Sequence, residues 1–100
     1  MDSWENIMFG ISLGATNRQT VVGRDEVNNY TIDTCYTVDC GWETAVWYDN
    51  YPMIIVARYP DEESAKQGHA TWVDTCTTNC PTHAFSVQTD RIESFMEEQV

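Results

Sequence analysis

The chain has 100 residues, which suffice for one domain around a single core and not for two. Apolar residues make up 42% of the chain and aromatic residues 12%, with only five glycines and three prolines. This composition excludes the disordered and fibrous classes of protein. We expect a single globular domain over residues 1–100.

The chain is strongly acidic, with sixteen Asp and Glu residues against five Lys and Arg residues and a formal net charge of −11. This balance disfavours direct binding to nucleic acid or to anionic membranes, because both depend on cationic side chains. It favours a protein partner that is cationic or whose own site holds nucleic acid. The alternative is that the charge only keeps the protein soluble.

Neither a secretory leader nor a membrane span is expected. Asp2 and Glu5 stand where a leader would carry basic residues, and the longest wholly apolar run covers only residues 53–57. We therefore expect a protein that is made and kept in a cytosol.

The first part of the chain predicts one strand and one loop. Residues 7–14 are apolar and β-compatible, although two glycines among them indicate a bulge or a close backbone approach. Residues 15–29 are polar and rich in turn-forming residues. We expect a loop there, with a short strand at residues 20–22 as the alternative.

Three strands are expected next. Residues 43–48 and 53–59 form a predicted hairpin, joined by the turn-forming residues 49–52, at the centre of the sheet. Before the interruption at Gly41, residues 30–38 alternate in the manner of a half-buried strand. The side chains expected to face the core are Ile32, Thr34, Tyr36 and Val38, and those expected to face water are Thr31, Asp33, Cys35 and Thr37.

A helix is predicted from residue 61 onward. Pro60 ends the preceding strand, Asp61 is a helix-capping residue, and Glu62 and Glu63 suit the positive end of the helix dipole. The expected inward stripe of this helix comprises Ala65, His69, Trp72 and Cys76.

After a chain break at Cys80 and Pro81, residues 85–87 are predicted to form a short edge strand. Asp90 is predicted to cap a final short helix with Ile92, Phe95 and Met96 on one side. The predicted fold class is α+β, a small antiparallel β-sheet packed against one main α-helix, with a short C-terminal helix.

The helix interior contains three residues that we interpret as structural. A histidine at position 69 could serve as a general base or a metal ligand, but we expect it to donate a hydrogen bond to a sheet carbonyl. Gly68 costs about 1 kcal/mol relative to alanine in a helix interior, which indicates close contact with a strand backbone. We assign Trp72 to the core.

The four cysteines form two local pairs, Cys35 with Cys40 and Cys76 with Cys80. Four thiolates suit a tetrahedral zinc site, but Cys35 and Cys40 would point to opposite faces of a regular strand. We expect reduced thiols and no cofactor, with a zinc site at these four residues or a disulfide as the alternatives.

No nucleophile elbow, phosphate-binding loop, metalloprotease helix or dinucleotide fingerprint occurs in the sequence. The carboxylates are spread along the chain, and no pair of them is placed as an acid and base couple. We therefore predict a protein that is not an enzyme.

A recurring pattern is clearest between residues 43 and 73. It comprises Phe9-Gly10, Glu43-Thr44 before an apolar strand, Arg58-Tyr59, and the acidic helix with Gly68-His69. In these features the sequence resembles a set of short uncharacterised proteins of tailed bacteriophages. The four cysteines and the segment after Thr75 depart from that pattern. The resemblance implies a phage context, with the host cytoplasm or the virion as the location, and no assigned activity.

Charge and resemblance together predict a non-enzymatic bacteriophage accessory protein that binds a host or phage protein, as an acidic inhibitor that mimics nucleic acid would. The alternative is a small virion structural protein of capsid or tail that self-associates or packs against neighbouring subunits. A small zinc-binding protein is the third hypothesis. The predicted acidic face comprises Asp61, Glu62, Glu63, Glu93, Glu97 and Glu98.

Overall fold

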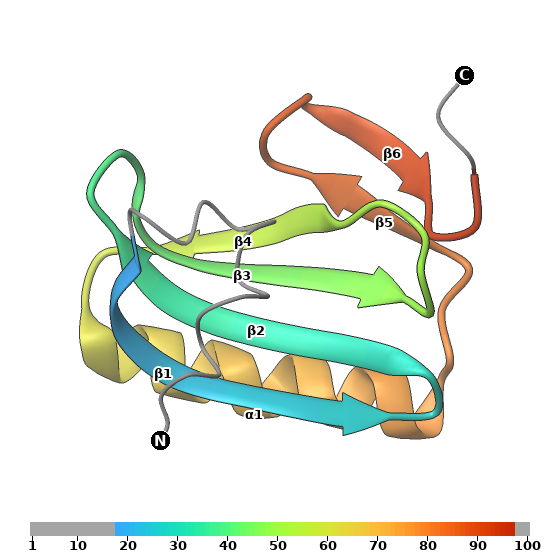
Figure 1. Cartoon of the computed structure of the whole chain (residues 1–100), viewed down its shortest axis with the longest axis horizontal. Coiled ribbons are helices and arrows are strands. Elements are labelled where there is room, and N and C mark those ends of the chain that lie inside the picture. The colour runs from blue at the N-terminus through green and yellow to red at the C-terminus, as the bar shows by residue number, and fades with distance from the viewer. Residues whose placement is uncertain (1–17, 98–100) are drawn as a thin grey trace.

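The computed structural model describes residues 18–97, and these residues form an α+β fold, which confirms the predicted class. A four-stranded antiparallel sheet in the order β1-β2-β3-β4 lies against one long helix, and a two-stranded hairpin follows that helix (Figure 1). The predicted strand at residues 7–14 lies outside the described residues. The elements are β1 Arg18–Val27, β2 Tyr30–Thr37, β3 Gly41–Tyr48, β4 Ile54–Tyr59, α1 Glu62–Thr78, β5 His83–Ser86 and β6 Arg91–Ser94.

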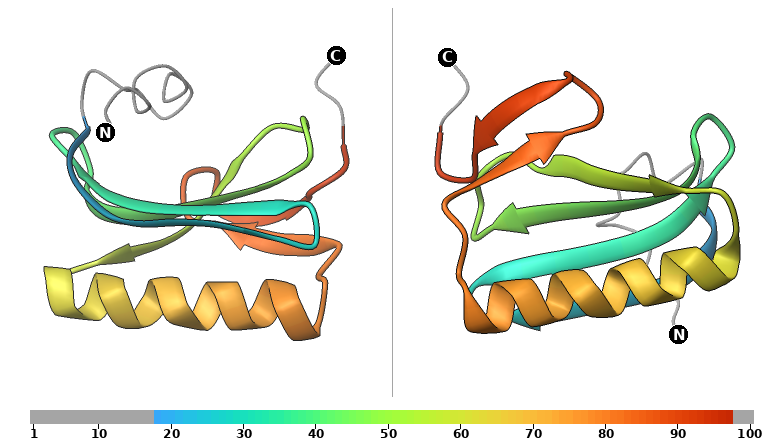
Figure 2. Two further views of the ribbon diagram at one scale, coloured as in Figure 1. Left: turned by 60° about the horizontal axis from the view of Figure 1, so that its bottom comes forward. Right: turned by 180° about the vertical axis from the view of Figure 1, so that it is seen from behind.

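The helix covers one face of the larger sheet (Figure 2). It runs along that face in contact with all four strands, and the β5–β6 hairpin lies beside β4. Val87, just after β5, donates its N–H to the carbonyl of Ile55 in β4 at 2.9 Å. The small hairpin is therefore tied to the edge of the larger sheet.

β1 corrects the loop that was expected at residues 15–29. From residue 18 onward the chain pairs with β2, and the alternative at residues 20–22 lies inside this longer strand. Asn28 and Asn29 have φ values of 53° and 71°, which suits a two-residue hairpin turn with positive φ at both positions. The loop prediction is wrong because β1 is an edge strand with several exposed polar side chains, so its composition is that of a loop.

The predicted hairpin of β3 and β4 is confirmed, with the turn at residues 49–52. β2, however, is buried on both faces, so the expected water-facing set (Thr31, Asp33, Cys35, Thr37) is wrong. On the face away from the helix, Arg24 lies 3.7 Å from Asp33, and Cys35 packs with Ala45 and Ile55. Val38 falls beyond the end of the strand and is exposed.

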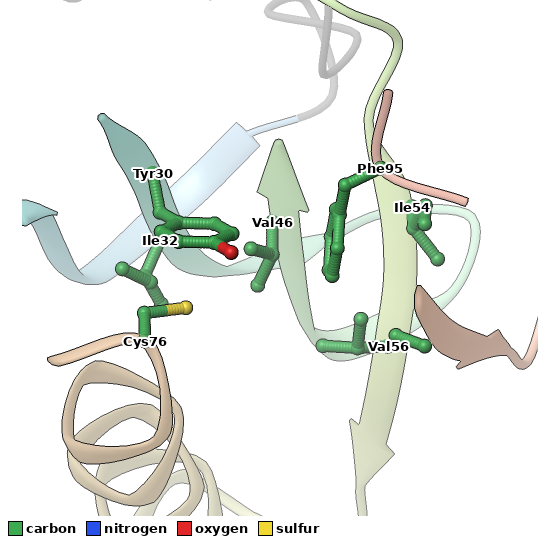
Figure 3. Close-up of a cluster of buried hydrophobic side chains, with 8 residues drawn as sticks. Tyr30, Ile32, Val46, Ile54, Val56, Cys76 and Phe95 are labelled. Atoms are coloured by element: carbon green, nitrogen blue, oxygen red, sulfur yellow. The ribbon is translucent and has the colours of Figure 1, made fainter. Parts of the chain in front are cut away.

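The main apolar cluster lies between the sheet and the C-terminal half of α1. Figure 3 shows Tyr30, Ile32 and Val46 of the sheet beside Cys76 of the helix, with Phe95 closing the other side. The rings of Tyr30 and Phe95 meet edge-on with centroids 5.6 Å apart. Phe95 is fully buried, and burial of such a ring contributes about 3–5 kcal/mol as judged by truncation to alanine. It fixes the segment after β6 to the core.

α1 begins as predicted, because the Oδ1 atom of Asp61 accepts the N–H of Ser64 at 2.8 Å. The inward stripe is also confirmed, with Ala65, His69 and Cys76 buried and Trp72 partly buried against the main cluster.

The predicted C-terminal helix is wrong, since this stretch contains β6, which pairs with β5. Asp90 has a φ of 63°, a left-handed turn conformation, whereas a helix-capping residue is extended. The hydroxyl of Ser86 accepts the N–H groups of Gln88 and Thr89 and so holds the turn. The expected edge strand at residues 85–87 is thus β5, which starts and ends earlier.

Candidate functional site

A chain of hydrogen-bonded side chains crosses the interface between the sheet and the helix. It takes one residue from each strand of the larger sheet and one from α1, and we call it the His69 network. The Nε2 atom of His69 lies 2.7 Å from Oδ2 of Asp25, and its Nδ1 atom lies 2.7 Å from the hydroxyl of Thr34. The chain continues from Thr34 to Thr44 at 2.6 Å and from Thr44 to Tyr59 at 2.9 Å.

For a neutral imidazole, the chemistry of these groups orients every proton in the network. An ionised carboxylate only accepts, so Nε2 of His69 carries the proton that points to Asp25. With a neutral ring, Nδ1 then accepts from Thr34, Thr34 accepts from Thr44, and Thr44 accepts from Tyr59. Burial raises the pKa of Tyr59, and the hydrogen bond with Thr44 lowers it less, so the phenol remains a donor. Each buried hydroxyl therefore donates once and accepts once.

Two glycines make room for the network. A Cβ atom at Gly23 of β1 would lie 2.9 Å from Nε2 of His69, so the imidazole rests directly on that strand. A Cβ atom at Gly68 would lie 2.3 Å from the ring of Tyr59. The close contact predicted at Gly68 is thus made by a side chain and not by strand backbone. The expected bond from His69 to a sheet carbonyl is likewise replaced by bonds to Asp25 and Thr34.

The order carboxylate, imidazole, hydroxyl is the order found in nucleophilic catalysis, where the hydroxyl must reach a substrate. Here Thr34 and Thr44 have 0% exposure, and the side chain of His69 is only 10% exposed. Asp25, at 56%, is the member that meets solvent most. The network is therefore suited to fixing the helix on the sheet, and the hydroxyls of Thr34 and Thr44 are out of reach of a substrate.

The predicted acidic face is divided into two clusters. Asp61, Glu62 and Glu63 are exposed at the start of α1, and we call them the helix-start cluster. Glu93 belongs to β6, which lies at the opposite end of the molecule from the start of α1 (Figures 1 and 2), and Glu97 follows that strand in the sequence. Glu98 lies outside the described residues.

Local bonds set the charge of the helix-start cluster. The N–H of Ser64, which Asp61 accepts, lowers the pKa of the Asp61 carboxyl, so this group stays ionised at neutral pH. Lys66 lies 3.9 Å from Glu62, an exposed pair one helical turn apart that screens the cluster weakly.

The cysteines are not gathered into one site. Cys76 belongs to the main cluster under the helix, whereas Cys35 lies in the cluster on the opposite face of the sheet, and Cys40 and Cys80 are exposed. No disulfide joins any two of them, and within residues 18–97 no group of three or more His, Cys, Asp or Glu side chains is close enough to hold a metal ion. Burial, and then the neighbouring Cys80, raise the pKa of Cys76 to about 11.

A polar hollow of about 420 Å³ lies beside the β1–β2 turn. On its floor the guanidinium of Arg24 sits over the ring of Trp47, 5.3 Å from the ring centre, and also faces Asp33 at 3.7 Å. The charge of Arg24 is thus already balanced by the carboxylate of Asp33. The residues that line the hollow include no histidine or cysteine.

Comparison of the chain with models of protein families, with curated proteins and with solved structures finds no match. Within residues 18–97, no helix has the length and apolar character that a membrane crossing requires.

Four members of the His69 network escaped the sequence analysis. Thr34 was placed on the inward face of its strand, and a polar residue there is itself a signal that a buried partner exists. Thr44 and Tyr59 occur in the sequence pattern only as parts of the pairs Glu43-Thr44 and Arg58-Tyr59, and as single residues each fits an ordinary strand position. Asp25 gives no signal of its own, because the composition of its segment is that of a loop.

Proposed function

We propose that the protein is a non-enzymatic bacteriophage accessory protein that binds a host or phage protein through the helix-start cluster. The observation that carries the proposal is the row of three consecutive exposed carboxylates, Asp61, Glu62 and Glu63, on a capped helix. Because the His69 network ties this helix to all four strands, the carboxylates are presented on a rigid support. Such a row complements a cationic site that normally holds phosphates.

The proposal of a protein without catalytic activity is supported by the burial of the hydroxyl groups that a substrate would have to reach. The hydroxyls of Thr34 and Thr44, which follow His69 in the network, are fully buried. His83, the other histidine, is exposed and bonds to its neighbour Thr82 at 2.9 Å. Neither arrangement places a nucleophile and its base in front of an open site.

The test is affinity capture of the tagged protein's partner from host lysate, at low and at high salt. The variant Glu62→Lys with Glu63→Lys keeps the Asp61 cap, and the control Glu26→Lys with Asp74→Lys makes the same change in net charge, from −11 to −7, at other exposed sites. We expect the partner to be lost with the first variant and at high salt, and kept with the control. Equal binding by both variants would refute the cluster as the contact.

A second candidate function is that of a small virion structural protein. It is favoured by three exposed apolar side chains on and beside the β5–β6 hairpin, Phe85 at 46%, Ile92 at 64% and Met96 at 44% exposure. Such side chains can pack against neighbouring subunits of a particle. Mass spectrometry of purified particles decides between the two, since an accessory protein should be absent from them.

A further inference from the structure

The outer edge of β6 has no strand partner among residues 18–97. In the described part of the chain β6 pairs only with β5, which in turn lies beside β4, so β6 is the outermost described strand on that side (Figure 1). An edge of this kind presents unpaired N–H and C=O groups in a row and is a template for another strand. On its outward face Ile92 stands opposite Phe85 of β5, and both are exposed.

The hydrogen-bond pattern identifies which backbone groups point to this edge. Phe95 donates its N–H to the carbonyl of Thr82 at 3.0 Å, and bonded pairs alternate along an antiparallel ladder. The pair Ala84 with Glu93 is therefore bonded, and the pair Phe85 with Ile92 is not. The N–H and C=O of Ile92 consequently point away from β5 toward the open edge.

The charged side chains on either side of Ile92 are complementary to the same side chains of a second copy of the chain. In an antiparallel pairing of two copies about a two-fold axis at Ile92, each residue before Ile92 faces the residue the same distance after it. Arg91 of one copy then faces Glu93 of the other, twice by symmetry, and the two Ile92 residues exchange their N–H and C=O bonds. Opposite charges in such cross-strand positions are stabilising.

From this edge we infer that two copies of the chain associate through β6, in antiparallel register centred on Ile92, to form a four-stranded sheet β5-β6-β6-β5. The side chains of Ile92 and Phe85 from both copies then lie on one continuous face. The formal charge of −11 on each chain opposes association, so the dimer forms reversibly and at salt concentrations that screen this repulsion. The inference is independent of the partner proposed for the helix-start cluster.

The test uses the purified protein alone, in sedimentation equilibrium at about 0.15 M salt, where the screening length is about 8 Å. The variants are Arg91→Glu, Glu93→Arg and the double swap that carries both. Each single variant places like charges opposite each other at two positions, and we expect it to weaken the dimer at least about tenfold. The double swap restores opposite charges and should restore the dimer. Thermal unfolding of each variant confirms that it is folded.

Net charge alone predicts a different result. Glu93→Arg makes the chain less acidic and would strengthen a dimer limited only by repulsion, whereas the register predicts that it weakens the dimer. The carboxylate of Glu93 also accepts a hydrogen bond from the hydroxyl of Thr89 at 2.5 Å. This bond is lost both in Glu93→Arg and in the double swap. A dimer that recovers in the double swap therefore reports the charge pairing and not the loss of this bond. A monomer at all concentrations, a dimer strengthened by Glu93→Arg, or a double swap that fails to recover would each overturn the inference.

Discussion

Replacement of Gly68 by alanine should destabilise the protein, although alanine is the better helix former. The change adds a Cβ atom 2.3 Å from the Cε1 and hydroxyl atoms of Tyr59, where ordinary carbon contacts are about 3.5–4.0 Å. The ring must therefore retreat by about 1 Å or more. Its hydroxyl bond to Thr44, now 2.9 Å, would then be broken.

The opposing contributions can be compared. Loss of the bond between Tyr59 and Thr44 costs about 0.5–1.5 kcal/mol, and overpacking of a tight contact costs about 1–3 kcal/mol. The helix gains about 1 kcal/mol from replacing glycine by alanine. The expected net loss in the free energy of unfolding is about 0.5–3.5 kcal/mol, which lowers the melting temperature by roughly 2–28 °C in a domain of this size.

Denaturant and thermal unfolding measure this loss, and the chain offers two controls. Ala70→Gly changes an exposed residue of the same helix, so it measures the effect of helix propensity alone. We expect it to lower the free energy of unfolding by about 1 kcal/mol. Tyr59→Ala removes the obstructing ring, so Gly68→Ala in that background should stabilise the protein by about 1 kcal/mol. If Gly68→Ala stabilised the otherwise unaltered chain by that amount, Tyr59 would not constrain the helix and the reasoning would be refuted.

Two further predictions concern buried polar groups. Thr34→Val keeps the shape of the side chain but leaves Nδ1 of His69 without a donor and the hydroxyl of Thr44 without an acceptor. The free energy of unfolding should therefore fall by about 2–4 kcal/mol in denaturant titration, and Thr34→Ser should retain most of the stability. The free energy of unfolding should also fall as the pH rises from about 9 to about 11. The pKa of the Cys76 thiol is raised to about 11 in the folded chain, so the unfolded chain loses this proton first. A Cys76→Ala variant should show a smaller decrease in that interval, and an unchanged slope would contradict the burial of this thiol.

Local signals were sufficient for the centre of the fold. Pro60 and Asp61 placed the start of α1, and apolar residues on either side of the turn at residues 49–52 placed the β3–β4 hairpin. In each case neighbouring residues impose the conformation through backbone geometry or capping, so long-range contacts are not needed to predict it.

The two wrong predictions of secondary structure concern segments whose conformation depends on distant contacts. β1 is polar and exposed, and it is a strand because it pairs with β2 and holds Asp25 and Gly23 against His69. The segment of β6 has the spacing of a short amphipathic helix, but Phe95 is drawn into the cluster around Tyr30, and its N–H bonds to Thr82 across the hairpin. Neither partner can be identified from the segment itself.

The fold holds the two halves of α1 by different means, and this bears on the proposed contact. The C-terminal half, at Cys76, is held by apolar packing and, at its end, by the side-chain amide of Asn28, which donates to the carbonyls of Cys76 and Thr77 at 3.2 Å. The half that follows Asp61 and carries Glu62 and Glu63 is held through the hydrogen bonds of His69 inside the sheet–helix interface. Hydrogen bonds are directional, so the network fixes the rotation and position of this half in a way that apolar contacts alone do not.

Weakening the network should therefore loosen the helix start before the helix end. In Thr34→Val, hydrogen exchange should accelerate for amides near residue 65 more than for those near Cys76, provided that exchange is measured where local opening precedes global unfolding. Uniform acceleration along α1 would mean that the helix opens as one unit and that the network does not position the acidic cluster separately. Affinity for the partner captured through the helix-start cluster should decrease in the same variant, because a mobile row of carboxylates must be ordered on binding.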